Sequence, residues 1–190
     1  MHDVLDNICE SKITGADGFF LGVKLTKTEL ETIRMLIKKQ WLERIDQQYP
    51  DLTHKFNDLG MERYHELSHS LDHSALWPKC ARILPKSAVK IIRTMSLFTK
   101  LESFYGHFML SDEENVGWEE MYWRLVRPNE LSDVGPLHAD AWFWALGHGC
   151  TPPNTVRIKV WIAIYCETGK NGLKLVPGSH NKEWRFHGEL

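Results

Sequence analysis

The sequence has no long hydrophobic run, few cysteines and little net charge, and each shortage excludes a class of protein. No stretch of about 18 consecutive apolar residues is present, so the sequence predicts no transmembrane helix. Residues 1–7 lack the basic and apolar regions of a secretory signal peptide, and we expect a cytoplasmic protein. The four cysteines show neither CxxC pairs nor zinc spacing, which is typical of a reducing compartment. The formal net charge of −2 favours neither nucleic acid nor a membrane surface as a partner.

Two helical patterns are present in the first half of this chain of 190 residues, whose length predicts a single domain. Thr26 and Glu29 form a capping box, in which each side chain satisfies a free N–H of the helix start. Apolar residues then recur at helical spacing: Leu30, Ile33, Ile37 and Trp41. These signals predict a helix that ends near residues 47–50. A second amphipathic helix is predicted over residues 84–98, with a stop near Gly106.

From His107 onward, short apolar runs alternate with turn residues. The runs cover residues 107–110, 119–126, 156–165 and 173–176, and residues 18–24 indicate an earlier short strand. Several short strands at this spacing are typical of a β-sandwich or barrel. The sequence therefore predicts an α+β fold with a mainly β core, in which residues 1–106 form a helical N-terminal part and residues 107–190 form the β core.

His138 and Asp140 are the leading candidates for chemistry. Residues two apart on an extended backbone point to the same side. A nitrogen and an oxygen donor on one face make two-thirds of the facial triad that holds non-haem Fe(II) and leaves positions open for O2 and a co-substrate. Bulky apolar groups next to such a site control access of water. We therefore expect Trp142, Trp144 and His148 to help bind a small-molecule substrate.

The order of four motifs resembles the phytanoyl-CoA dioxygenase family. They are His138-Ala-Asp140, Val160-Trp-Ile-Ala163, Asn171-Gly-Leu173 and Val176-Pro-Gly-Ser-His180. This resemblance implies a double-stranded β-helix, or jelly roll, with N-terminal helices. It also implies an Fe(II)- and 2-oxoglutarate-dependent dioxygenase that uses O2 to hydroxylate a small organic substrate.

The same resemblance implies roles for individual residues. His138 and Asp140 are expected to bind iron, and Trp161, Trp123 and Arg124 are expected to line the 2-oxoglutarate pocket. Lys159 shares a face with Trp161 by two-residue alternation. A solvated lysine is the favoured interpretation of this residue, and contact with a carboxylate in the pocket is the alternative.

The third iron ligand is not identified by the resemblance. In the family, the second His ligand and an Arg that pairs with 2-oxoglutarate follow well downstream of the Pro-Gly-Ser-His segment. Only His180 and His187 remain as candidates in the last stretch of the sequence, and His180 matches a loop residue of the family. We therefore expect a C-terminally incomplete jelly roll with exposed strand edges and little activity of its own.

Two other functions stay open. The segment His65-Glu66-Leu-Ser-His69 matches HExxH, which on a helix binds zinc in metalloproteases, with the Glu as general base. Its flanking residues are polar, which favours a solvated segment. A non-enzymatic cupin-like or jelly-roll binding module would explain the β pattern without a third metal ligand.

Overall fold

The longest element is the helix α2 (Lys27–Gln48), and it begins where the capping box predicts. The computed structural model describes residues 15–146, 152–167 and 169–185. At the start of α2 the Glu29 N–H donates to Thr26 Oγ1 at 3.2 Å, and the Thr26 N–H donates to Glu29 Oε2 at 2.7 Å. The helix ends before Pro50, which cannot continue it. The prediction for this helix is confirmed.

Five further α-helices lie in the described part of the chain. They are α3 (Thr53–Leu59), α4 (His73–Leu76), α5 (Lys86–Arg93), α6 (Ser96–Tyr105) and α7 (Asp140–Ala145). Short 3-10 turns connect them: η1 (Pro50–Leu52), η2 (Met61–Glu66), η3 (Ser68–Ser70), η4 (Lys79–Arg82), η5 (Leu131–Asp133) and η6 (Ser179–Asn181). The single helix predicted over residues 84–98 is two helices, because the chain breaks at Thr94 and Met95. The predicted stop at Gly106 is confirmed, and this glycine has a φ of 69°.

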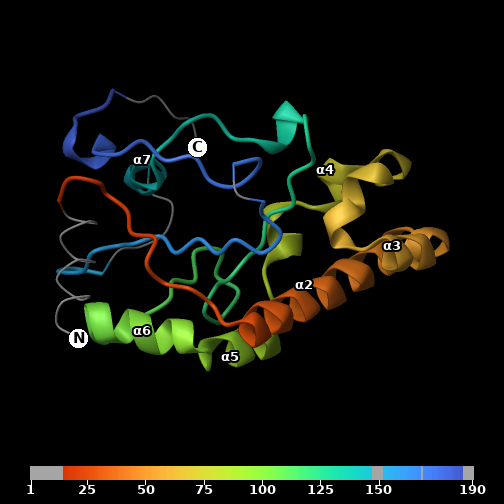
Figure 1. Cartoon of the computed structure of the whole chain (residues 1–190), viewed down its shortest axis with the longest axis horizontal. Helices are drawn as coiled ribbons and strands as arrows, with labels where there is room; N and C mark the ends of the chain where they lie inside the picture. The colour runs from red at the N-terminus through yellow and green to blue at the C-terminus, as the bar shows by residue number, and fades with distance from the viewer. Residues whose placement is uncertain (1–14, 147–151, 168, 186–190) are drawn as a thin grey trace.

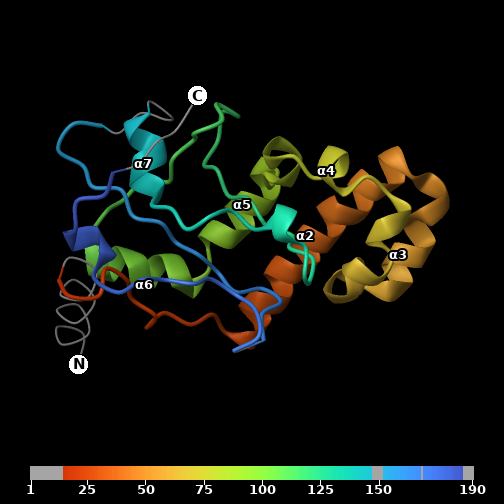
Figure 2. The ribbon, with the colours of Figure 1, turned by 90° about the horizontal axis from the view of Figure 1, so that it is seen from above.

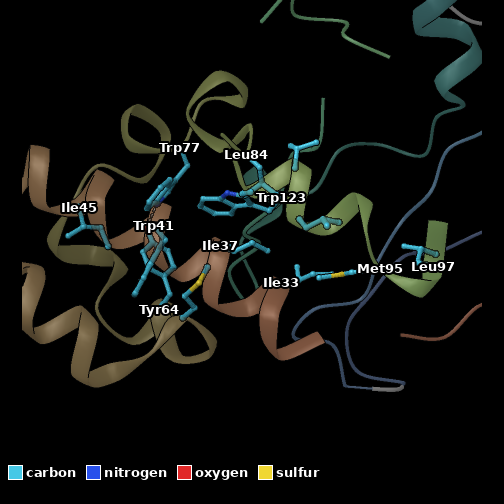
Figure 3. Packing of buried hydrophobic residues seen from close by; sticks show 14 of the residues in the cluster. Ile33, Ile37, Trp41, Ile45, Tyr64, Trp77, Leu84, Met95, Leu97 and Trp123 are labelled. Atoms are coloured by element: carbon cyan, nitrogen blue, oxygen red, sulfur yellow. Dashed lines mark hydrogen bonds between the residues drawn. The ribbon is translucent and has the colours of Figure 1, made fainter. Parts of the chain in front are cut away.

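The hydrophobic core is built mainly by helices. One stripe of α2 is buried at intervals of four residues: Ile33, Ile37, Trp41 and Ile45. Figure 3 shows this stripe with side chains of the following segments packed against it. The Trp41 ring meets the Phe56 ring of α3 edge to face, with centroids 5.9 Å apart. From the second half of the chain, Trp123 enters this core, and its Nε1–H donates to Gln40 Oε1 at 2.8 Å.

The predicted jelly roll with a mainly β core is contradicted by the structure. Among the described residues, the only β pairing is an isolated antiparallel bridge between Ile83 and Tyr122. The predicted strands at residues 18–24, 107–110, 119–126, 156–165 and 173–176 form no sheet. An alternating pattern selects which side chains face inward, but a strand also needs a partner that accepts its hydrogen bonds. Residues 82–84 supply such a partner for residues 121–123 alone.

The irregular segment 156–165 lies against the helices. In Figure 1, α2, α5 and α6 follow one edge and α7 lies on the opposite side, with this segment running between them. Arg34 of α2 donates to the carbonyl oxygen of Ile164 at 2.7 Å. In both views, α3 and α4 lie at one end and α7 lies toward the other (Figures 1 and 2). No helix in the described ranges is long and apolar enough to cross a membrane.

Candidate metal site

His138 and Asp140 lie side by side at the start of α7. Ala139, between them, has an extended backbone with φ −110° and ψ 132°, which sends its two neighbours to the same side. The His138 Nε2 atom lies 3.8 Å from Asp140 Oδ1. Asp140 is the first residue of α7, where a carboxylate also interacts favourably with the free N–H groups of the helix. The structure thus brings together the two residues that the sequence predicts as metal ligands.

The hydrogen bond of His138 sets the orientation of its ring. Nδ1 lies 2.7 Å from the carbonyl oxygen of Pro136. A carbonyl oxygen can only accept, so Nδ1 is the donor in this bond, and Nε2 is the ring nitrogen that faces Asp140. Metal-binding histidines usually donate their second N–H to a carbonyl or carboxylate in this way. The side chains of His138 and Asp140 are 54% and 36% exposed, so a metal ion can reach them from solvent.

Lys159 and Tyr122 complete the surroundings of Asp140. The Lys159 ammonium lies 3.7 Å from Asp140 Oδ2 and donates to the Tyr122 hydroxyl at 3.2 Å. Burial opposes the charge of Lys159, but the interactions with Tyr122 and Asp140 outweigh it and raise the pKa of Lys159 above its ordinary value. The Lys159 side chain is 44% exposed, which agrees with the favoured interpretation of a solvated lysine, and its ammonium also approaches the carboxylate of Asp140. The sequence analysis did not identify Tyr122 as part of this site. Tyr122 lies next to Trp123, and alternation places the two side chains on opposite faces.

The three residues expected around 2-oxoglutarate lie in different environments. Trp161 is 45% exposed, and it is part of the same extended segment as Lys159. Trp123 is only 6% exposed and packs its ring 5.1 Å from that of Trp77, on the side of the helical core. Arg124 is exposed, and its Nη2 donates to the carbonyl oxygen of Asp133 at 3.0 Å. A shared co-substrate pocket for these three residues stays a prediction.

The aromatic residues of α7 are held by side chains from other segments. The Trp144 Nε1–H donates to Glu113 Oε1 at 3.1 Å, and the Arg157 guanidinium lies 4.9 Å from the centre of the Trp144 ring. The Trp142 ring lies 6.5 Å from that of Trp184. Both tryptophans are half-buried in the segment that directly follows Asp140. His148, the third residue expected to contact substrate, lies outside the described residues.

Neither candidate for the third metal ligand joins the pair at α7 among the residues that the structure describes. His180 Nε2 lies 2.8 Å from the carbonyl oxygen of Gly15, so this ring contacts the N-terminal segment. His187 lies outside the described ranges. Within those ranges, no group of three or more His, Cys, Asp or Glu side chains is close enough to hold a metal ion. His138 and Asp140 are therefore a pair of candidate ligands, and the described residues bring no third candidate next to them.

The HExxH segment does not have the helical geometry of a zinc protease. His65 and Glu66 end the 3-10 turn η2, and His69 lies in the separate turn η3, so no continuous α-helix aligns the two histidines. The Arg63 guanidinium binds both oxygens of Glu66 at 2.8 Å and lowers the pKa of this carboxyl below its ordinary value. A carboxylate held in this ion pair is a weak general base.

Comparison with known proteins agrees with the motifs around α7. Residues 32–188 match the sequence model of the phytanoyl-CoA dioxygenase (PhyH) family. This range covers most of the chain and includes His138, Asp140, Lys159 and Trp161. No curated protein and no solved structure gives a significant match.

Proposed function

Because the chain belongs to the phytanoyl-CoA dioxygenase family, we propose that it is an Fe(II)- and 2-oxoglutarate-dependent oxygenase that hydroxylates a small organic substrate. The family suggests an oxygenase-type enzyme, and the observation that carries the finer proposal is the placement of His138 Nε2 3.8 Å from Asp140 Oδ1. An imidazole nitrogen and a carboxylate oxygen on one side of the backbone suit Fe(II) and leave other coordination positions open.

The residues of the chain have distinct tasks in this proposal. His138 would bind the metal through Nε2, while its Nδ1–H is held by the carbonyl oxygen of Pro136. Asp140 would bind through Oδ1, because its other oxygen, Oδ2, faces the ammonium of Lys159 at 3.7 Å. This arrangement favours one carboxylate oxygen as the ligand. Bound Fe(II) would supply the positions at which O2 and 2-oxoglutarate react, and the overall change converts substrate C–H, O2 and 2-oxoglutarate into C–OH, succinate and CO2.

The half-buried aromatic residues of α7 support a second task, the exclusion of water. Trp142 and Trp144 follow Asp140 on the same short helix, and Trp144 is fixed by Glu113 and Arg157. A rigid apolar wall next to a metal lowers the local dielectric constant and limits side reactions with solvent. We therefore assign the side of the site lined by α7 to the substrate.

The first test is an anaerobic titration of the purified chain with Fe(II) and 2-oxoglutarate. Chelation of iron by 2-oxoglutarate gives a visible charge-transfer band, which we expect for the unmodified chain. Asp140→Ala should abolish the band, because it removes one of the two ligands. Asp58→Ala is the matched control, since Asp58 is an exposed residue of α3, away from α7, and the band should persist.

A parallel pair of variants tests the imidazole. His138→Ala should abolish the band, and His54→Ala, which removes an exposed histidine of α3, should leave it unchanged. A band of full intensity in Asp140→Ala or His138→Ala contradicts the proposal. The absence of a band in the unmodified chain, with helix content intact by circular dichroism, also contradicts it.

A further inference from the structure

A small polar cavity lies at the α4 end of the molecule, away from the candidate metal site. It has a volume of about 170 Å3, and the argument uses six of its lining residues: His73, Ser74, Arg82, Arg124, Ser132 and Asp133. This volume equals roughly five or six water molecules at about 30 Å3 each. Both views place α4 and α7 at different ends of the molecule (Figures 1 and 2). The lining of the cavity includes neither His138 nor Asp140, although Arg124 is also one of the residues that the family resemblance implies for the 2-oxoglutarate pocket.

Arg82 brings a positive charge to the wall of this cavity without a carboxylate partner among the described residues. Its Nε donates to the carbonyl oxygen of Trp77 at 3.0 Å, and its Nη1 donates to that of Trp123 at 2.7 Å. Both acceptors are neutral, so they fix the guanidinium without balancing its charge. Burial and the nearby charge of Arg124 lower the pKa of Arg82 below its ordinary value. Arg82 and Arg124 line the same cavity, so their two guanidinium groups are near one another.

Asp133 does not neutralise this pair of arginines, because Arg127 already occupies both of its oxygens. Arg127 Nη2 donates to Oδ1 and Arg127 Nε donates to Oδ2, each at 2.8 Å. The backbone N–H of Arg127 adds a third bond to Oδ2 at 2.9 Å. Burial lowers the pKa of His73 below its ordinary value, so this ring is neutral at pH 7. Among the residues that line the cavity, Arg82 and Arg124 therefore carry positive charges that no described carboxylate hydrogen-bonds.

We propose that this cavity binds a phosphate group, held by the guanidinium groups of Arg82 and Arg124. A phosphate monoester carries about −1.5 to −2 charges at pH 7 and three acceptor oxygens, which matches two uncompensated positive charges. The fork of an arginine binds two such oxygens at once. The hydroxyls of Ser74 and Ser132 line the same cavity and supply further donors. A carboxylate has a single negative charge and two acceptor oxygens, so it would balance fewer positive charges and accept fewer hydrogen bonds from the cavity.

The proposal is independent of iron, so its failure leaves the proposed function intact. The test is a titration of inorganic phosphate into the metal-free chain at constant ionic strength and pH 7, followed by 31P line broadening. We expect saturable binding of phosphate. Arg124→Gln should weaken it by about tenfold or more, because a charged hydrogen-bond donor is lost. Arg124 is exposed, and its one hydrogen bond to another described residue is to a carbonyl oxygen, so the fold should survive, and circular dichroism checks this.

A matched control separates this cavity from general attraction to positive charge. Lys90→Gln removes one charge from an exposed position of α5 and should change phosphate affinity by less than about twofold. The proposal is overturned if phosphate shows no saturable binding, or if Arg124→Gln and Lys90→Gln weaken it equally. A separate titration uses 2-oxoglutarate in place of phosphate as the probe. Binding of 2-oxoglutarate that depends on Arg124, without binding of phosphate, would also overturn the proposal and make the cavity a carboxylate site.

Discussion

Asp133→Asn should destabilise the protein by about 2.5 kcal/mol at pH 7. The Asp133 side chain is only 4% exposed, and hydrogen bonds from Arg127 are the largest cause that lowers its pKa from 3.8 to about 2. A pKa difference of nearly two units corresponds to about 2.5 kcal/mol of stability, at about 1.4 kcal/mol per unit. Asparagine keeps the shape of the side chain but removes the charge. Arg127 then loses its ion-pair partner next to Arg82 and Arg124.

The pH dependence of this effect follows from the sign of the pKa shift. The folded state lowers the pKa of Asp133, so its stabilisation is fully present above the unfolded value of 3.8 and is lost as pH falls toward about 2. Urea unfolding at a series of pH values measures the difference between the unmodified chain and Asp133→Asn. We expect this difference to fall by about half between pH 7 and pH 3.

Two results would refute this reasoning about Asp133. One is a difference below about 1 kcal/mol at pH 7, and the other is a difference that does not change between pH 7 and pH 3. Asp58→Asn is the matched control, because Asp58 is exposed on α3, and it should change stability by less than about 0.5 kcal/mol. Glu29 also has a pKa lowered to about 2, so the comparison of variants, rather than the acid sensitivity of the unmodified chain, isolates Asp133.

Two further predictions concern the core and the candidate metal site. Ile45 is fully buried in α2, so Ile45→Ala should lower the free energy of unfolding, measured in urea, by about 2–5 kcal/mol. Met35→Ala is the control: Met35 is 64% exposed, and its replacement should change this free energy by less than about 0.5 kcal/mol. Lys159→Met should lower Fe(II) affinity by about tenfold in the anaerobic titration, because Lys159 orients Asp140. An equal loss of affinity in the control Lys90→Met would contradict that role.

The helix α2 could be predicted from the sequence because its signals are local. The capping box spans four residues, and the buried stripe repeats every four residues. The break between α5 and α6 could not be predicted in this way. The backbone N–H of Ser96 at the start of α6 donates to Glu29 Oε1 of α2 at 2.5 Å, and Thr94 Oγ1 bonds the Ile91 carbonyl oxygen at 2.7 Å. A contact across 67 residues of sequence therefore helps to set the start of α6.

The β prediction was wrong for a different reason. Alternation is present only in residues 161–165 of the segment 156–165, since Ile162 and Ile164 pack against the core while Trp161 and Tyr165 are 45% and 37% exposed. Val156, Ile158 and Val160 share the parity of these isoleucines but are exposed. This pattern determines which side chains face inward. It contains no information on which segment accepts the backbone hydrogen bonds, and among the described residues this segment has no strand partner. Sequence periodicity thus agrees with the faces of residues 161–165 only, and the strand pairing that it predicted is wrong.

The candidate metal site divides in the same way into local and distant parts. His138 and Asp140 are brought together by one extended residue, so two-residue spacing in the sequence is enough to predict their proximity. Lys159 reaches Asp140 from 19 positions further along, and Tyr122 reaches Lys159 across 37. Their contribution depends on how three segments pack, which no short motif encodes. In the proposed site, the local pair would therefore supply the ligand atoms, and distant side chains would decide which carboxylate oxygen is free to bind a metal.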